Sequence, residues 1–397
     1  MVSVSEATSF IQQYLFKPEK ERIKIDLLEG RILAEIVKAD RDFPPFDRVS
    51  MDGIAIHFKA FEEGWRDFKV EGLQAAGQPR TTLKDVNNCI EVMTGAMLPI
   101  GCDTVIRYED VLILNKIARL KVDSIEKAQS THPRGGDAKK GKTLLRPGHR
   151  ISPSEIALLV SVGKSDAEVL AFPKTAIVST GNELVDIHDS PQPHQIRRSN
   201  SYTLQTALTT IGCVPTLFHL EDERNALERE LTKILNNYQL VILSGGVSKG
   251  KFDLVPAALE SLGIKKVFHE VRQKPGKPFW FGVSKKNSVF ALPGNPVSTF
   301  LCYYKYVKPW LIKSMGIDDG QDSVILASDI SFQSDLTYFL QVKIKNESGR
   351  LMAYPISSGG SGDFASLKDV DGFLELSSER KDFKAGEAFP FIPSRNK

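Results

Sequence analysis

Short apolar runs and helical patterns alternate from residue 175 to residue 315, and this alternation constrains the fold more than any other feature. The apolar runs are Thr175–Thr180, Val214–Phe218, Leu240–Leu243, Val267–Val271, Phe279–Val283 and Val289–Leu292. The helical patterns cover Ser201–Ile211, a stretch after Asp222, Leu254–Leu262 and Pro296–Met315. Asn200 and Asp222 precede two of these patterns as expected N-caps. Continuous apolar strands that alternate with helices predict a doubly wound α/β sheet covered on both faces.

Three glycine-containing loops follow strands of this predicted sheet. They are Ser244–Gly250, Lys274–Pro278 and Leu292–Pro296. Ligands of such sheets bind at the carboxyl ends of the strands, so we expect the three loops in one cleft. Glycines let backbone N–H groups face a ligand, and lysines add positive charge. The loops therefore predict an anion pocket, with phosphate as the favoured anion.

The first loop has groups that suit a phosphate and a metal ion. Gly245 and Gly246 leave room for the phosphate against the backbone, and Ser244 and Ser248 add hydroxyl donors. Asp253 follows the loop and opens the next helix. Its carboxylate is expected either to cap that helix or to hold Mg²⁺ beside the phosphate, and the two roles are compatible.

The other loops add cations, an amide and an acid. Prolines restrict the backbone around Lys274 and Lys277, which favours oxyanion binding over a solvated charge pair. Asn295 stands between glycine and proline, where it serves either a ligand or a structural turn. Glu183 follows the first strand of the sheet and is either an exposed loop acid or a second metal ligand in the same cleft.

Composition excludes several classes of protein. The 397 residues suffice for two to four domains, and 41% hydrophobic with 25% charged residues is typical of a globular protein. A net charge of +3 predicts no nucleic-acid or membrane partner, and neither a signal peptide nor a membrane-spanning stretch is found. The four cysteines stand far apart, so we expect reduced, mostly buried thiols in a cytoplasmic protein.

Other catalytic motifs are missing from the sequence. His188 and His194 lack the spacing of a zinc site. No GxGxxG follows the first strand, no Walker A sequence is found, and no cysteine has a local activating context. These absences argue against cysteine-nucleophile, dinucleotide and P-loop chemistry.

The flanking regions have other patterns. Glu6–Phe16 predicts an amphipathic helix, and Asp67–Val122 predicts a small β domain because β-type residues alternate with turns. Strands are expected at Val324–Ile330, Thr337–Lys345 and Leu351–Pro355. A turn around Ser348 joins the last two strands as a hairpin, so the chain ends in a β module.

Taken in order, the motifs resemble the molybdopterin molybdotransferases, the family of MoeA and the gephyrin E domain, over nearly the whole chain. Besides the three loops, the matching segments are Pro44–Asp47 with Ser50–Gly53, Met93–Ala96 with Gly101–Asp103, Arg134–Asp137, Ser179–Leu184 and Ser361–Gly362 with Ala365–Leu367. A single Ser-Gly-Gly also occurs in the related molybdopterin adenylyltransferases, whereas the complete ordered set is specific.

The resemblance implies a multidomain α/β protein with four domains. An elongated discontinuous domain takes residues 1–47 and 133–172, with a small β domain inserted at 48–132. A molybdopterin-binding domain with a doubly wound mixed sheet takes 173–316, and a β-barrel-like module takes 317–397. The resemblance also implies a homodimer with its active site at the subunit boundary, supplied by a molybdopterin adenylyltransferase and serving molybdoenzymes.

The implied reaction takes adenylylated molybdopterin and molybdate, cleaves the phosphoanhydride with Mg²⁺, releases AMP and leaves molybdenum on the dithiolene. Matching residues then acquire expected roles. Gly245, Gly246 and Ser248 cradle a phosphate, and Asp253 and Glu183 hold the metal. Further residues expected to bind substrate or anion are Lys274, Lys277, Ser298, Ser244, Pro293 and Asn295. Four more are expected to reach the cleft from the partner subunit or to contact substrate: Asp52, Thr94, Arg134 and Asp137.

Four positions depart from the family pattern. Asn182 and Ser199 stand where acids are usual, and His132 and Leu340 stand where arginines are usual. Two alternatives therefore stay open. One is a molybdopterin adenylyltransferase-like enzyme, which would consume ATP without molybdate. The other is a binding or scaffold protein that keeps the fold and has lost activity.

Overall fold

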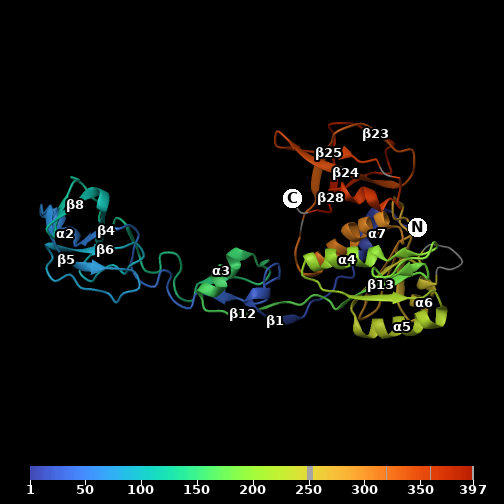
Figure 1. Ribbon diagram of the computed structural model, residues 1–397, viewed down its shortest axis with the longest axis horizontal. Coiled ribbons are helices and arrows are strands. Elements are labelled where there is room, and N and C mark those ends of the chain that lie inside the picture. The colour runs from blue at the N-terminus through green and yellow to red at the C-terminus, as the bar shows by residue number, and fades with distance from the viewer. Residues whose placement is uncertain (248–253, 319, 358, 396–397) are drawn as a thin grey trace. The chain divides into compact units, whose positions relative to one another are not determined.

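The computed structural model describes residues 1–247, 254–318, 320–357 and 359–395. The chain forms two compact units, each traced in Figure 1. The first unit takes Met1–Arg22, Gly30–Ile32 and Glu168–Lys397, and the second takes Ile23–Glu29 and Leu33–Ala167. The first unit therefore contains all three glycine-containing loops.

The centre of the first unit is a six-stranded sheet in the order β16-β13-β17-β21-β20-β18. These strands are β13 (Thr175–Thr180), β16 (Thr216–Leu220), β17 (Leu240–Ser244), β18 (Lys265–His269), β20 (Trp280–Val283) and β21 (Ser288–Leu292). Strands β16, β13, β17 and β21 pair in parallel, whereas β20 pairs antiparallel with both neighbours. The predicted mixed, doubly wound sheet is confirmed.

Helices cover both faces of this sheet (Figure 1). One face is covered by α1 (Val4–Gln12), α4 (Ser199–Thr210), α7 (Pro296–Cys302) and α8 (Lys308–Ser314), the last two joined by a π-helical turn at Tyr303–Val307. The other face is covered by α5 (Arg224–Asn237) and α6 (Val255–Ser261). Leu204 and Leu208 of α4 and Leu227 and Leu231 of α5 are buried. Each such side chain contributes about 1.5–3 kcal/mol of burial free energy.

Two expected helix caps are wrong. Helix α5 is capped by Glu223, whose carboxylate accepts from the backbone N–H groups of Asn225 and Ala226 at 3.0 and 2.7 Å. Helix α4 begins at Ser199, so Asn200 lies inside it. The longer Glu223 side chain reaches back over the first turn, which leaves the shorter Asp222 to other contacts. Helix α1 spans Val4–Gln12 rather than Glu6–Phe16, because Ser3 and Glu6 form a capping box.

The C-terminal part of the first unit is a closed five-stranded barrel. Its strands are β22 (Asp322–Leu326), β24 (Thr337–Glu347), β25 (Arg350–Pro355), β26 (Gly372–Leu376) and β28 (Ala388–Pro393), and pairing of β24 with β26 closes the ring. The predicted hairpin is confirmed, with positive φ at Ser348 and Gly349. The short strand β19 (Gln273–Lys274) also pairs with β24, in parallel. The second glycine-containing loop is thereby attached to the barrel.

The second unit contains the small β region. Its six-stranded sheet comprises β4 (Gly53–Ile56), β5 (Asp67–Gln74), β6 (Asn88–Val92), β7 (Thr104–Arg107), β8 (Val111–Leu114) and β9 (Ile117–Leu120). Other elements of the unit are α2 (Phe58–Glu62), α3 (Pro153–Ser161), β2 (Val37–Lys38), β3 (Arg48–Val49), β10 (Thr131–His132) and β11 (Thr143–Leu145). Short strands elsewhere are β1 (Lys20–Lys24), β12 (Asp166–Leu170), β14 (Leu184–Val185), β15 (Ile196–Arg197), β23 (Ile330–Ser331) and β27 (Asp382–Phe383). The domain boundaries expected from the sequence stay a prediction.

The cysteines lie as the composition predicts. All four cysteines are buried and unbridged, as predicted. Burial raises the pKa of the Cys302 thiol to about 12, so it is neutral at physiological pH. Within the described ranges, no helix has both the length and the apolar character needed to cross a membrane.

Candidate anion-binding pocket

A pocket of about 750 Å³ lies at the carboxyl edge of the central sheet, between its loops and the barrel. It is lined by the ends of β13, β17 and β21 and by the Lys274–Pro278 loop. The structure brings together eight residues expected at a common site: Glu183, Gly245, Gly246, Lys274, Lys277, Pro293, Asn295 and Ser298. Loops about 110 residues apart in sequence meet there because parallel strands share one carboxyl edge.

The first loop requires glycine at two positions. Gly245 has φ of 101°, and a Cβ there would lie 2.7 Å from the carbonyl oxygen of Thr180. Gly246 has φ of 65°, and its Cβ would lie 2.8 Å from Cγ2 of Val255. Both left-handed backbone conformations and both close approaches exclude side chains. The loop therefore packs closely against the end of β13, and Gly245 and Gly246 line the pocket with backbone atoms alone.

Other residues of this loop fall outside the lining. Ser244 is buried beneath the pocket, where its hydroxyl accepts a 2.8 Å hydrogen bond from Nδ2 of Asn200. The same amide donates to the Gly294 carbonyl at 2.7 Å, so Asn200 connects two loops instead of capping α4. Ser248 and Asp253 lie outside the described residues, and their expected roles stay predictions.

The two lysines bring positive charge to the pocket. Among the described residues, neither Lys274 nor Lys277 forms an ion pair, and the Nζ of Lys274 lies 5.5 Å from the centre of the Phe332 ring. By contrast, Lys305, which lies outside this lining, is paired with Glu375 at 2.6 Å. The two lysine charges are therefore available to an anion in the pocket.

Two carboxylates, Glu183 and Asp222, line the same pocket. The backbone N–H of Asp222 donates to Oδ1 of Asn182 at 3.1 Å, which ties the Gly-Asn-Glu loop to the end of β16. From the sequence, Asp222 is expected only as a helix cap. An Asp-Glu pair before a helix is ambiguous, since either acid can cap, so the sequence alone could not single out Asp222.

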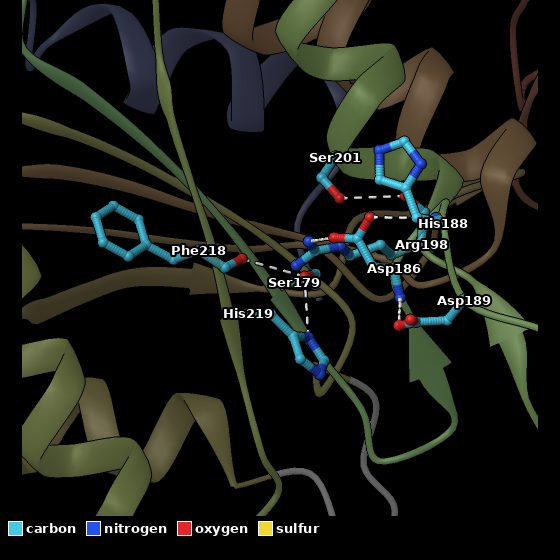
Figure 2. A network of polar contacts seen from close by, with 8 residues as sticks. All are labelled: Ser179, Asp186, His188, Asp189, Arg198, Ser201, Phe218 and His219. Atoms are coloured by element: carbon cyan, nitrogen blue, oxygen red, sulfur yellow. Dashed lines mark hydrogen bonds and ion pairs between the residues drawn. The ribbon is translucent and has the colours of Figure 1, made fainter.

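A polar network holds the loop that follows Glu183 (Figure 2). Asp186 forms an ion pair and hydrogen bond with Arg198. Partial burial acts to raise the pKa of Asp186, but the hydrogen bond and charge of Arg198 outweigh it and the pKa is lowered. Between β13 and β16, the hydroxyl of Ser179 donates to the Phe218 carbonyl at 3.1 Å and lies 3.1 Å from Nδ1 of His219. These contacts hold the loop after Glu183 and join the ends of β13 and β16.

The barrel supplies lining residues that sequence reasoning missed. Tyr338, Gln341 and Ser361 line the pocket, and Nδ2 of Asn295 donates to the Ser361 hydroxyl at 2.8 Å. Leu340, by contrast, is 4% exposed and packs inside the barrel. Phe339 and Gln341, on either side of Leu340 in β24, line the pocket, whereas Leu340 points into the barrel because side chains alternate along a strand. At the position where the family usually has an arginine, Leu340 therefore packs inside the barrel.

The expected site residues of the second unit are joined in local pairs. The Thr94 N–H and hydroxyl donate to Oδ1 of Asp52 at 2.6 and 2.8 Å. These hydrogen bonds, the backbone one first, hold the pKa of Asp52 below its ordinary value. Nε of Arg134 donates to Asp42 at 2.7 Å. Oδ1 of Asp137 lies 3.0 Å from Nε2 of His132.

The fold and the pocket define a class: a multidomain α/β protein with a lysine- and glycine-lined pocket between a doubly wound sheet and a C-terminal barrel. Residues 2–163 match the MoeA N-terminal region (domain I and II), residues 176–313 a probable molybdopterin binding domain, and residues 323–394 the MoeA C-terminal region (domain IV). The chain belongs to the MoeA family, the molybdopterin molybdenumtransferases.

Similar proteins extend over the whole chain. A molybdopterin molybdenumtransferase of Synechocystis sp. is 40% identical over 396 residues, covering 98% of this chain and 99% of its own length. One from Haemophilus influenzae is 30% identical over 99% of this chain and 98% of its own. A crystal structure of a molybdopterin biosynthesis MoeA protein from Pyrococcus horikoshii has a TM-score of 0.84 at 30% identity, with full coverage of both chains.

Proposed function

We propose that the protein is a molybdopterin molybdenumtransferase of molybdenum cofactor biosynthesis. It accepts adenylylated molybdopterin and molybdate, and it releases AMP as molybdenum passes to the dithiolene. The observation that carries this proposal is the pair Lys274 and Lys277, unpaired among the described residues and facing a glycine-lined pocket. The full-length similarity to proteins named for this activity supports it.

The pocket residues have distinct roles in the proposed reaction. Gly245 and Gly246 expose backbone next to the phosphate that links pterin and nucleotide. Lys274, Lys277 and Ser298 bind molybdate, a tetrahedral dianion that matches ammonium and hydroxyl donors. Pro293 and Asn295 shape the opposite wall, where the Asn295 amide is oriented by Ser361. This arrangement positions an oxyanion next to the phosphate.

A divalent metal ion fits the acidic side of the pocket. Glu183 and Asp222 provide the oxygen donors that Mg²⁺ prefers, and both line the pocket. We include Asp253 in this donor set on the sequence alone. When bound, Mg²⁺ would neutralise charge on the phosphoanhydride. Asn182 contributes by holding the Asp222 backbone, a role that an amide fulfils as well as an acid.

The proposal extends to the state of the protein in the cell. We propose a cytoplasmic homodimer in which Asp52, Thr94 and Asp137 of each subunit's second unit approach the pocket of the partner, and in which Arg134 contacts substrate. A molybdopterin adenylyltransferase would supply the substrate, and molybdoenzymes would receive the product. Analytical ultracentrifugation tests the dimer, and a single monomeric species at micromolar concentration would contradict it.

The decisive experiment incubates the purified protein with adenylylated molybdopterin, Mg²⁺ and molybdate, and follows AMP. We expect AMP release that requires both molybdate and the metal. Release without molybdate, or consumption of ATP with molybdopterin, would instead indicate an adenylyltransferase-like enzyme. Binding of adenylylated molybdopterin without any AMP release would indicate a scaffold that retains the pocket.

A further inference from the structure

The loop that carries Lys274 and Lys277 is held by the buried side chain of Gln273. Gln273 is 0% exposed, and its Nε2 donates to the carbonyl oxygens of Pro275 at 3.2 Å and Gly276 at 3.1 Å. Its Oε1 accepts a hydrogen bond from the hydroxyl of Tyr306. The amide of Gln273 therefore holds the loop through Nε2 and is itself anchored through Oε1.

These contacts determine the direction of the loop's N–H groups. In a trans peptide the carbonyl and the following N–H point in opposite directions. Since the carbonyls of Pro275 and Gly276 point inward to Gln273, the N–H groups of Gly276 and Lys277 point outward. Both residues line the pocket, and among the described residues neither N–H donates a hydrogen bond.

The neighbouring contacts reinforce this orientation. The carbonyl of Lys277 is held by the backbone N–H of Val271 at 3.0 Å, and Pro278 has no N–H. Gly276 has φ of 87°, and a Cβ there would lie 2.7 Å from Nε2 of Gln273 and 2.9 Å from Sγ of Cys302. Only glycine therefore allows the loop to close over the amide.

We propose that the N–H groups of Gly276 and Lys277 form an oxyanion nest and that Gln273 is the positioning residue that creates it. Successive N–H groups on one side of a turn bind anions, and the two ammonium groups add charge. The ligand is a tetrahedral oxyanion, either molybdate or a phosphate of the substrate. The choice of molybdate rests on the proposed function, whereas the nest itself rests on the contacts of Gln273.

The anchoring of Gln273 connects the nest to two other parts of the first unit. Tyr306 lies in the π-helical turn between α7 and α8, a type of turn frequent near functional sites. Gln273 also pairs with Thr337 of barrel strand β24. The position of the nest is thus fixed by the helix pair and the barrel together, and a change at either support shifts the anion donors.

The chain has a matched control at the opposite edge of the same sheet. Asn287 is also a buried amide, and its Nδ2 donates to the carbonyls of Leu235 at 2.8 Å and Tyr238 at 2.7 Å. Its Oδ1 accepts from the Ser284 hydroxyl at 2.7 Å. Replacing Asn287 removes the same kinds of hydrogen bonds as replacing Gln273, but outside the pocket.

The test compares Gln273→Met with Asn287→Leu in the full chain, by calorimetric titration with molybdate, phosphate and AMP in turn and by thermal unfolding. We expect both variants to unfold at lower temperature. Gln273→Met should raise the Kd of the anion that wild type binds about tenfold, whereas Asn287→Leu should leave it unchanged. Tyr306→Phe removes only the hydrogen bond that anchors Gln273 and should raise the Kd less. It keeps the test valid if Gln273→Met does not fold.

The outcomes separate the two proposals. The proposed nest would be overturned by any of three results. The Kd could be unchanged in Gln273→Met and Tyr306→Phe, it could rise equally in Asn287→Leu, or the wild type could bind none of the three anions. If wild type binds phosphate or AMP but not molybdate, and Gln273→Met weakens that binding, the nest stands and the molybdate assignment fails.

Discussion

The pocket of the first unit and the Asp52–Thr94 cluster of the second contrast in how their charged groups are used. In the pocket, Lys274 and Lys277 have no ion-pair partner among the described residues. In the cluster, Asp52 accepts two hydrogen bonds from Thr94. A charge without a partner gains its main interaction when a ligand binds, whereas a satisfied carboxylate already stabilises the free fold. Both sets were expected to be functional from the sequence, and the structure shows that their charged groups differ in the partners they have.

The largest effect is expected from removing the unpaired charges. Lys274→Ala should lower kcat/KM for molybdate-dependent AMP release by about 100-fold or more, because a charge-assisted contact to the oxyanion is lost. Thermal stability should hardly change, since Lys274 forms no ion pair with any of the described residues. Lys286→Ala, at the opposite sheet edge, is the control and should retain activity. Full activity in Lys274→Ala would remove this lysine from the site.

The acidic side of the pocket should respond next. Asp222→Asn should lower AMP release about 10-fold or more, with partial recovery at higher Mg²⁺ concentration, because a metal ligand is weakened. Glu223→Gln changes the adjacent acid, which caps α5, and should affect unfolding without changing the Mg²⁺ requirement. If the two variants depend on Mg²⁺ alike, Asp222 has no special connection to the metal.

A third prediction concerns the glycine that brings the loop against β13. Gly245→Ala should cost about 3 kcal/mol of folding free energy, since it adds a clash with Thr180 to an unfavourable backbone conformation. Gly263 has φ of 82° with nothing within 4 Å of its Cβ position, so Gly263→Ala should cost about 1 kcal/mol. Urea unfolding measures both. Equal losses of folding free energy in the two variants would show that the close approach of Gly245 to Thr180 adds no penalty.

The smallest effect is expected in the second unit, and it should depend on pH. The pKa of Asp52 is lowered from 3.8 in the fold, so its stabilising contribution is complete above that value and disappears as the pH falls through the lower folded pKa. Thr94→Val should therefore lower the unfolding temperature at pH 7 but not well below pH 3.8. A penalty that persists in acid would assign the effect to packing.

Much of the fold was predictable because it depends on periodicity. The strands of the central sheet were found because both faces are covered and their apolar runs are continuous. Helix boundaries and caps were not predictable from periodicity. Asp222 and Glu223 both precede α5, and which carboxylate reaches the first N–H groups of the helix depends on the folded backbone. The joining of β19 to the barrel was not predictable, because a two-residue strand has no pattern.

The sequence by itself determined the alternating sheet, the family and the loops with their glycines and lysines, because these depend on local composition and order. The tertiary structure decided which groups face the pocket. It placed Ser244 and Leu340 inside the protein, brought Asp222 to the lining, and turned the carbonyls of the lysine loop toward Gln273. Such directions depend on contacts between segments far apart in the chain, and no local pattern encodes them.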